Sequence, residues 1–296
     1  MSFRLRPRKS ITRELRRLAR KQLRNARGLL QANTPPDPNA VHEARKSLKK
    51  VRTIIQLIDA DEGRRLDGST KRLRRVAHML SRVRDADAMQ ETVETLHKQQ
   101  PRLLTSAIMK RLKSWMSARR RSVRAGFDDA TWTSVEDELR ALRRKARHWR
   151  PSHRDFSAIA HGIETIHRRG RKALKRAMAR QMADDFHRWR KQIKSLWYGL
   201  RLLQPTDSRL GRDIRALRHA EQQLGNDHNV VVLCSALSKD DVLRRTPLGV
   251  DQLKLAADRQ HLKARKTAIA AAQSIYQHGS RQYARNLKRM WSRRTQ

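Results

Sequence analysis

Two stretches of sequence, VHEARKSLKKVRTIIQLI (41–58) and FHRWRKQIKSLWYGLRLL (186–203), share one pattern, and the second repeats the first at a constant offset of 145 residues. In each copy a histidine is followed by basic residues at the same spacing. The matched pairs are His42 with His187, Arg45 with Arg190, Lys46 with Lys191, and Lys49 with Lys194. A repeat of this kind indicates one structural unit used twice.

A second pair of segments extends the repeat. LSRVRDADAM (80–89) aligns with LGNDHNVVVL (224–233) at an offset of 144, and the same offset pairs Arg74 with Arg218. The chain is therefore predicted to contain two related halves. The predicted parts are a single domain over residues 1–296, an N-terminal half at about 8–127, a bridging helix at about 128–150, and a C-terminal half at about 151–293.

Apolar residues recur with helical spacing along nearly the whole chain. In the first copy the apolar stripe consists of Val41, Ala44, Leu48, Val51, Ile55 and Ile58. No stretch shows the sustained alternation and hairpin turns that are typical of β-strands. The sequence thus predicts an all-α fold, in which the duplicated helical hairpins form a pseudo-two-fold bundle with equivalent faces meeting at its centre.

The charge of the chain predicts the nature of its partner. The 296 residues include 70 Lys and Arg against 28 Asp and Glu, which gives a formal net charge of +42. Of the 70 basic residues 51 are Arg, whose planar guanidinium groups bind phosphate or carboxylate oxygens two at a time. Because like charges oppose compaction, we expect a polyanionic partner.

Helical geometry gathers part of this charge on one face of each copy. On a helical wheel Arg45, Lys46 and Lys49 share the sector of His42, and the apolar residues lie opposite. The same sector in the second copy holds His187, Arg190, Lys191, Lys194 and Tyr198. Cations four residues apart destabilise a helix, so a basic stripe present twice predicts an anion site. A solvated basic face is the alternative for either stripe alone.

Nucleic acid is the first alternative partner, since a net charge of +42 also suits RNA or DNA. The chain has only 6 Trp, 3 Tyr and 4 Phe. Trp115, Trp149, Trp189 and Trp291 stand at helical spacing among apolar residues, which is typical of core positions rather than of base-stacking platforms. We expect nonspecific nucleic-acid binding to be weak.

An enzyme is the second alternative. Glu94-Thr95-Leu96-His97 and Glu164-Thr165-Ile166-His167 resemble half of a di-iron carboxylate site, which also needs inward-facing Glu on two further helices. No phosphate-binding loop, serine-hydrolase elbow or HExxH zinc motif occurs, and Cys234 stands beside predicted core residues. We expect no catalytic site, no metal and no cofactor. Asp85, Asp87 and Asp227 are interpreted as helix caps or as partners that orient nearby Arg.

The sequence also predicts where the protein works. No apolar run approaches the roughly 20 residues of a membrane span, and the N-terminus lacks the apolar region of a secretory signal. The single cysteine excludes an intrachain disulfide framework. Basic amphipathic helices bind anionic lipid surfaces, but here the apolar stripes are needed inside the bundle. We expect a soluble, cytoplasmic protein that does not insert into membranes.

The repeated motifs resemble the CHAD family, the conserved-histidine α-helical domain. The resemblance rests on H-x-x-R-K-x-x-K-K-x-R from His42, on H-x-x-R-K-x-x-K-x-x-W-Y from His187, and on the R-D-A-D and L-G-N-D-H-N segments, and it spans nearly the whole chain. It implies two four-helix-bundle halves around a central basic pore. It also implies binding of inorganic polyphosphate, association with polyphosphate granules, and no catalytic activity.

Carried onto this sequence, the resemblance and the repeat give the candidate polyphosphate-binding residues. These are His42, Arg45, Lys46, Lys49, Lys50, Arg52, Arg84, His187, Arg190, Lys191, Lys194, Tyr198, Arg16, Arg17 and Arg218. Polyphosphate has no bases to stack, so recognition by charge-assisted hydrogen bonds from Arg, Lys and His is chemically consistent. The alternative for each His is a buried residue that orients a neighbouring helix. Ser195, Trp197 and Asn229 replace Lys50, Arg52 and Asp85 of the first copy, so we expect the halves to grip the ligand unequally.

Overall fold

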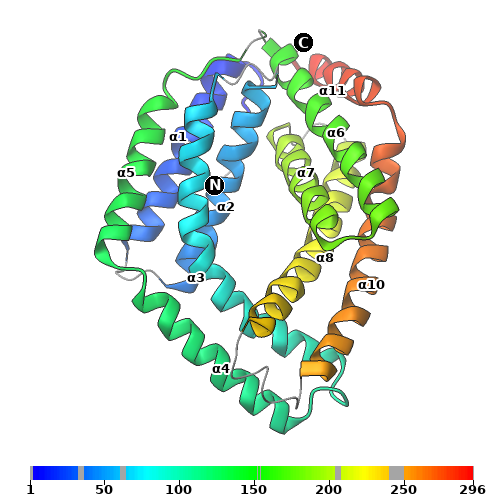
Figure 1. Ribbon diagram of the computed structural model, residues 1–296. Coiled ribbons are helices and arrows are strands. Elements are labelled where there is room, and N and C mark those ends of the chain that lie inside the picture. Colours follow the sequence, from blue (N-terminus) through cyan, green and yellow to red (C-terminus); the bar gives the residue numbers. More distant parts are fainter. Residues whose placement is uncertain are drawn as a thin grey trace.

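The computed structural model describes residues 3–32, 37–60, 65–151, 153, 155–203, 208–239 and 250–295, and all regular secondary structure in this part is helical (Figure 1). The prediction of an all-α fold is therefore confirmed. The helices are α1 (Ile11–Gln31), α2 (Pro38–Ile58), α3 (Asp67–Gln99), α4 (Ser106–Ala125), α5 (Asp129–Lys145), α6 (Asp155–Arg180), α7 (Ala183–Leu202), α8 (Ser208–Ser238), α10 (Val250–Gln277) and α11 (Ser280–Thr295).

Local sequence explains where several helices begin. The carboxylate of Asp37 accepts a hydrogen bond of 2.8 Å from the Ala40 backbone amide, and Pro38 occupies the first turn of α2. At α5 the Asp128 carboxylate accepts one of 2.9 Å from the Thr131 amide. A side-chain acceptor at the N-cap satisfies amides that have no partner inside the helix, and proline fits the first turn because its missing N–H is not needed there.

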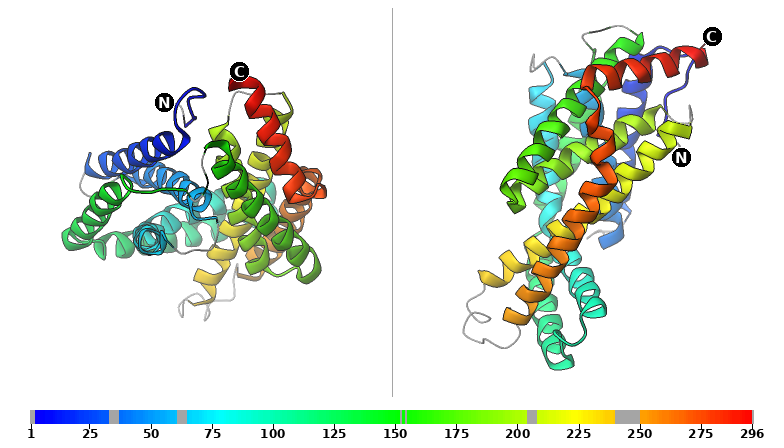
Figure 2. Two further views of the ribbon diagram at one scale, coloured as in Figure 1. Left: turned by 90° about the horizontal axis from the view of Figure 1, so that it is seen from above. Right: turned by 90° about the vertical axis from the view of Figure 1, so that its right-hand side faces the viewer.

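The helices form two groups that lie side by side. In the first group α1 packs on α2 and α5, and α3 packs on α2 and α5; in the second, α7 packs on α6 and α8, α10 on α8, and α11 on α6. The groups meet where α2 contacts α6 and α7 and where α3 contacts α8 (Figures 1 and 2). A two-fold relation between them stays a prediction.

Helix α5 falls within the predicted bridging segment at about 128–150 and packs on α1 and α3 of the first group (Figure 1). Its role as a bridge between two related halves stays a prediction. Its buried residues Val135, Leu139 and Leu142 belong to the main core. The apolar stripe therefore correctly indicated a packed helix, but it carried no information about which helices it packs on.

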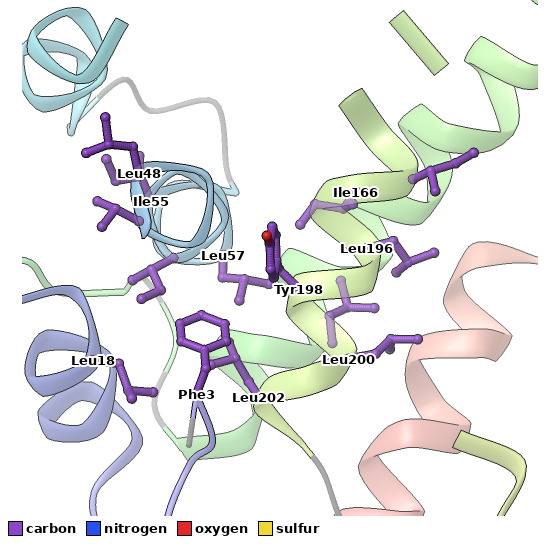
Figure 3. Close-up of a cluster of buried hydrophobic side chains, with 14 of the residues drawn as sticks. Phe3, Leu18, Leu48, Ile55, Leu57, Ile166, Leu196, Tyr198, Leu200 and Leu202 are labelled. Atoms are coloured by element: carbon purple, nitrogen blue, oxygen red, sulfur yellow. The ribbon is translucent and has the colours of Figure 1, made fainter. Parts of the chain in front are cut away.

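One hydrophobic core runs through both groups. It includes residues of α1, α2 and α3 from the first group and of α6, α7 and α8 from the second. Figure 3 shows Phe3 under Tyr198 at the seam of α1, α2 and α7. Their ring centroids are 6.1 Å apart. The backbone amide of Leu5 donates to the Leu202 carbonyl at 2.9 Å, which fixes the N-terminal segment against α7. A second, smaller core lies between α3, α4, α8 and α10.

The backbones of α2 and α6 come unusually close at Gly162. A Cβ atom at this position would lie 2.7 Å from the Leu57 Cα and 2.8 Å from the Leu57 carbonyl oxygen. Glycine is thus required for this approach of the two groups. None of the helices in the described ranges combines the length and apolarity that a membrane span requires.

Candidate anion-binding site

A cavity of about 680 Å³ lies at the seam of the two groups. Four helices form its wall: α2 and α3 from the first group, α7 and α8 from the second. The Arg, Lys and His residues that line it are His42, Arg45, Lys49, Arg52, Arg74, His78, Arg84, His187, Arg190, Lys191, Lys194 and His228. The carboxylates that line it are Asp85, Glu91 and Glu221. Eight Arg and Lys side chains thus face three carboxylates in one cavity.

Helix α2 contributes its basic face, as helical spacing requires. His42, Arg45, Lys49 and Arg52 are three or four residues apart and therefore lie on one side of the helix. The Arg45 guanidinium donates a hydrogen bond of 2.8 Å to the Ala77 carbonyl oxygen of α3. Burial, together with the neighbouring Arg84 and Lys49, lowers the pKa of His42 and so favours the neutral form of its ring.

Helix α7 contributes the equivalent face of the second copy. Burial lowers the pKa of Lys49 well below its ordinary value, and the nearby Lys194 of α7 lowers it further. The two repeat-matched lysines are therefore neighbours at the seam, and their charges repel. An electropositive cavity that is crowded in this way is stabilised by an anion.

A pair of histidines from α7 and α8 faces the same cavity. The rings of His187 and His228 have centroids 4.1 Å apart. Burial, the His228 ring and the neighbouring cations lower the pKa of His187 to about 3. Burial and the neighbouring cations lower the pKa of His228 to about 4. Among the described residues, the buried Nδ1 of His187 has no hydrogen-bond partner.

Carboxylates engage some of the cations. On α3, Arg84 forms an ion pair of 2.9 Å with Glu91, whose side chain is largely exposed. On the opposite wall, the Glu221 carboxylate of α8 contacts Arg190 at 3.0 Å and also Lys194. The Glu221 carboxylate on the α8 wall is buried and contacts two cations, whereas the Glu91 carboxylate on the α3 wall is exposed and contacts one.

A second cavity of about 710 Å³ adjoins the first. Its wall includes Arg169 of α6 together with polar residues of α2, α3 and α7. Arg52, Arg74 and Lys191 line both cavities, so basic side chains mark the junction. The electropositive surface thus extends from the first cavity into the second.

Nine of the fifteen predicted residues line the first cavity. They are His42, Arg45, Lys49, Arg52, Arg84, His187, Arg190, Lys191 and Lys194. Three others from the repeated motifs lie elsewhere. Lys46 pairs with Glu43 at 2.7 Å, Lys50 lies 5.6 Å from the centre of the Phe3 ring, and Tyr198 is only 2% exposed in the hydrophobic core.

The predicted arginines outside the repeat also lie away from this cavity. Arg16 donates a hydrogen bond of 2.6 Å to the Trp149 carbonyl oxygen, and Arg17 forms an ion pair of 2.7 Å with the buried Glu14. Both therefore stabilise the fold around α1. Arg218 is exposed on α8, near Arg201.

The cavity also contains residues that sequence reasoning did not select. Arg74 and His78 lie one turn apart on α3, but neither is three, four or seven residues from Arg84, so helical spacing from Arg84 gave no signal for them. His228 matches Arg84 at the offset of 144, which is a signal in the repeat. Glu221 matches Ala77, so nothing in the repeat indicated an acidic residue there.

The histidines of the two Glu-x-x-His segments have structural partners. Both ring nitrogens of the buried His167 have hydrogen-bond partners, the Ser280 hydroxyl and the Ile275 carbonyl, each at 2.9 Å. His97 Nδ1 lies 2.8 Å from the Leu104 carbonyl oxygen. Within the described ranges no three His, Cys, Asp or Glu side chains come together as a possible metal site.

The aspartates interpreted as caps or orienting partners lie inside helices. Asp87 is 3.6 Å from Arg124, and Asp227 accepts hydrogen bonds from His261 at 2.7 Å and from Arg265 at 2.9 Å. For these two the partner interpretation is confirmed and the cap interpretation is wrong. Asp85 lines the cavity, where burial raises the pKa of its carboxyl group and the nearby Arg45 opposes this effect.

Comparison with known proteins gives a consistent family. The sequence model of the family described as "CHAD domain" matches residues 11–238. The fold is similar to the crystal structure of the CHAD domain from the plant Ricinus communis, with a TM-score of 0.65 and 16% identity over 92% of this chain and 95% of that one. It is also similar to PptA from Streptomyces chartreusis, with a TM-score of 0.57 and 16% identity over 91% of this chain and 100% of that one. A search of curated protein sequences finds no match. Because the family match spans well over half of the residues, the chain belongs to the CHAD domain family.

Proposed function

We propose that this protein binds inorganic polyphosphate in the cavity between α2, α3, α7 and α8, and that it does so without chemical conversion. The observation that carries the proposal is the excess of eight Arg and Lys over three carboxylates in one cavity. Polyphosphate carries about one negative charge per phosphate, and charge-assisted hydrogen bonds with counterion release supply its affinity. The polyphosphate binding implied by the family resemblance agrees with this charge.

The composition of the wall favours polyphosphate over nucleic acid. No Phe, Tyr or Trp is among the described residues that line the cavity. Proteins that bind single-stranded nucleic acid commonly stack bases on aromatic rings, each contributing about 1–3 kcal/mol. Polyphosphate has no bases to stack, so the absence of aromatic rings from the described lining does not reduce its affinity. The described tryptophans Trp149, Trp189 and Trp291 are buried in the core instead.

The test is a titration with long-chain polyphosphate over a salt series, competed by RNA and by short phosphates. We expect tight binding that weakens as salt rises, and displacement by RNA only at a large excess. Preference for RNA, or equal affinity for long and short phosphates, would reject polyphosphate as the ligand.

We further propose that the protein is cytoplasmic and associates with polyphosphate granules. This location follows from the ligand, because a protein that binds the polymer gathers where the polymer is concentrated. A fluorescent fusion should co-localise with granules and become diffuse when the cavity arginines are replaced. Co-localisation that survives this replacement would indicate another means of recruitment.

A further inference from the structure

Glu221 places a negative charge within the basic cavity. Its carboxylate contacts Arg190 at 3.0 Å and Lys194, and only 11% of the side chain is exposed. Burial raises the pKa of Glu221, but Lys194 and Arg190 outweigh burial and bring it below its ordinary value. The carboxylate is therefore ionised, and it occupies a position between two cations that suits a phosphate group equally well.

The repeat shows that this carboxylate is particular to the second wall. At the matched position of α3 stands Ala77, whose carbonyl oxygen accepts the hydrogen bond from Arg45. On α8, Gly225 follows Glu221 by one turn, and a Cβ at this glycine would lie 3.1 Å from the Arg190 guanidinium. Arg190 thus lies close to the α8 backbone and beside the Glu221 carboxylate.

We propose that Glu221 acts as an internal anion that keeps small anions out of the cavity while a polymer still binds. The inference rests on the proposed function for the identity of the polymer. A free phosphate or sulfate ion at this position contacts little besides Arg190 and Lys194, so displacing a tethered carboxylate there leaves it little net affinity. A long chain is also held by Arg52, Arg74 and Arg84, and these contacts outweigh the same local penalty.

The consequence concerns competition in a cell. With Glu221 in place, ambient orthophosphate does not occupy the position between Arg190 and Lys194, and polyphosphate does not have to displace it there. Without the carboxylate, orthophosphate and sulfate gain a position between Arg190 and Lys194 and become effective competitors. Glu221 thus determines specificity for the polymer over its monomer.

The experiment compares wild-type protein with Glu221→Gln and with Glu138→Gln as a matched control. Glu138 also pairs with two basic residues, Arg72 at 2.8 Å and Arg75 at 2.7 Å, and its side chain is 15% exposed, but it does not line the cavity. We expect Glu221→Gln to bind sulfate and orthophosphate at least about tenfold more tightly, since two unit charges in contact interact strongly in a buried setting. The control should change anion affinity by less than about threefold, because Glu138 lies outside the cavity and salt screens its charge at that distance.

A second measurement tests specificity directly. Millimolar orthophosphate should leave polyphosphate binding by the wild type nearly unchanged and weaken that of Glu221→Gln at least severalfold. No gain in sulfate affinity, or weaker binding of every anion, would overturn the inference, because Glu221 would then only position Arg190 and Lys194. Should circular dichroism show that Glu221→Gln does not fold, Glu221→Asp replaces it: the shorter acid should give a smaller gain, and no gain overturns the inference.

The sulfate measurement separates this inference from the proposed function. If Glu221→Gln gains sulfate affinity while the wild type fails to bind polyphosphate, the internal anion stands and the proposed ligand is wrong. If the wild type binds polyphosphate and the variant gains nothing, the proposed function stands and the role of Glu221 is wrong.

Discussion

The junction of the two cavities offers the sharpest test of the binding site. Arg52 and Arg74 line both cavities, and the pKa of Arg52 is lowered by burial and by the neighbouring Arg74. The two guanidinium groups therefore repel each other in the free protein. Replacing both with Gln removes this repulsion, so we expect the double variant to fold at least as stably as the wild type.

The loss of affinity follows from the contacts that two arginines make with phosphate. A hydrogen bond to a charged group contributes about 1.5–3 kcal/mol. Because Arg74 is exposed, we take the lower value, about 1.5 kcal/mol, for each side chain. The double variant should then lose about 3 kcal/mol of binding free energy, which is about 150-fold in affinity. Two fewer phosphate contacts should also reduce the slope of log affinity against log salt by about 1.4.

Calorimetric titration with long-chain polyphosphate at several salt concentrations measures both quantities. The control is Arg119→Gln with Arg121→Gln, two exposed arginines of α4 that do not line this cavity. Its net charge equals that of the test variant, so bulk attraction is matched. An equal loss in the control would assign binding to overall charge, and a loss below about threefold in the test variant would refute the cavity.

Three further predictions concern stability and pH. Gly162→Ala should destabilise the fold by about 1–3 kcal/mol in chemical denaturation, because its Cβ would overlap the α2 backbone, whereas Gly28→Ala, with nothing within 4 Å, should stabilise it by about 0.5–1 kcal/mol. Affinity for polyphosphate should rise as the pH falls from 8 to 5, because the pKa values of His187 and His228, about 3 and about 4 in the free protein, increase beside bound phosphate. Calorimetry in buffers of different ionisation enthalpy should show proton uptake on binding. An affinity that is constant over this pH range would contradict the prediction. Glu14→Gln should lower the free energy of unfolding by about 2 kcal/mol at pH 7 and leave polyphosphate binding unchanged. Burial raises the pKa of this carboxyl group, but Arg17 and Arg6 outweigh burial and lower it to about 2. The difference in stability between variant and wild type should therefore vanish as the pH falls from about 4.5 toward 2.

The all-α fold and most of the cavity followed from the sequence because both depend on helical spacing. His42, Arg45, Lys49 and Arg52 face one way on any regular helix, and the offset of 145 transfers this face to α7. The repeat also predicted that equivalent faces meet, and the neighbouring Lys49 and Lys194 are consistent with it.

The remaining details depend on contacts between distant parts of the chain. Tyr198 shares the wheel sector of Lys194, yet Phe3 from the N-terminal segment covers it and places it in the core. Arg16 lies against the Trp149 backbone, which no side-chain pattern encodes. Glu221 was missed because the repeat reveals only residues of the same kind in both copies, and the residue that matches Glu221 is Ala77.

The hydrophobic core that runs through both groups has a consequence for how the ligand is received. Because the wall helices α2, α3, α7 and α8 all contribute to this core, the walls of the cavity are held in place before any anion arrives. A preorganised receptor loses little conformational entropy on binding, so the ordering falls almost wholly on the flexible polymer. Affinity should then grow with the length of chain that the cavities can align, and a stiff polyanion that cannot follow their course should bind poorly however densely it is charged.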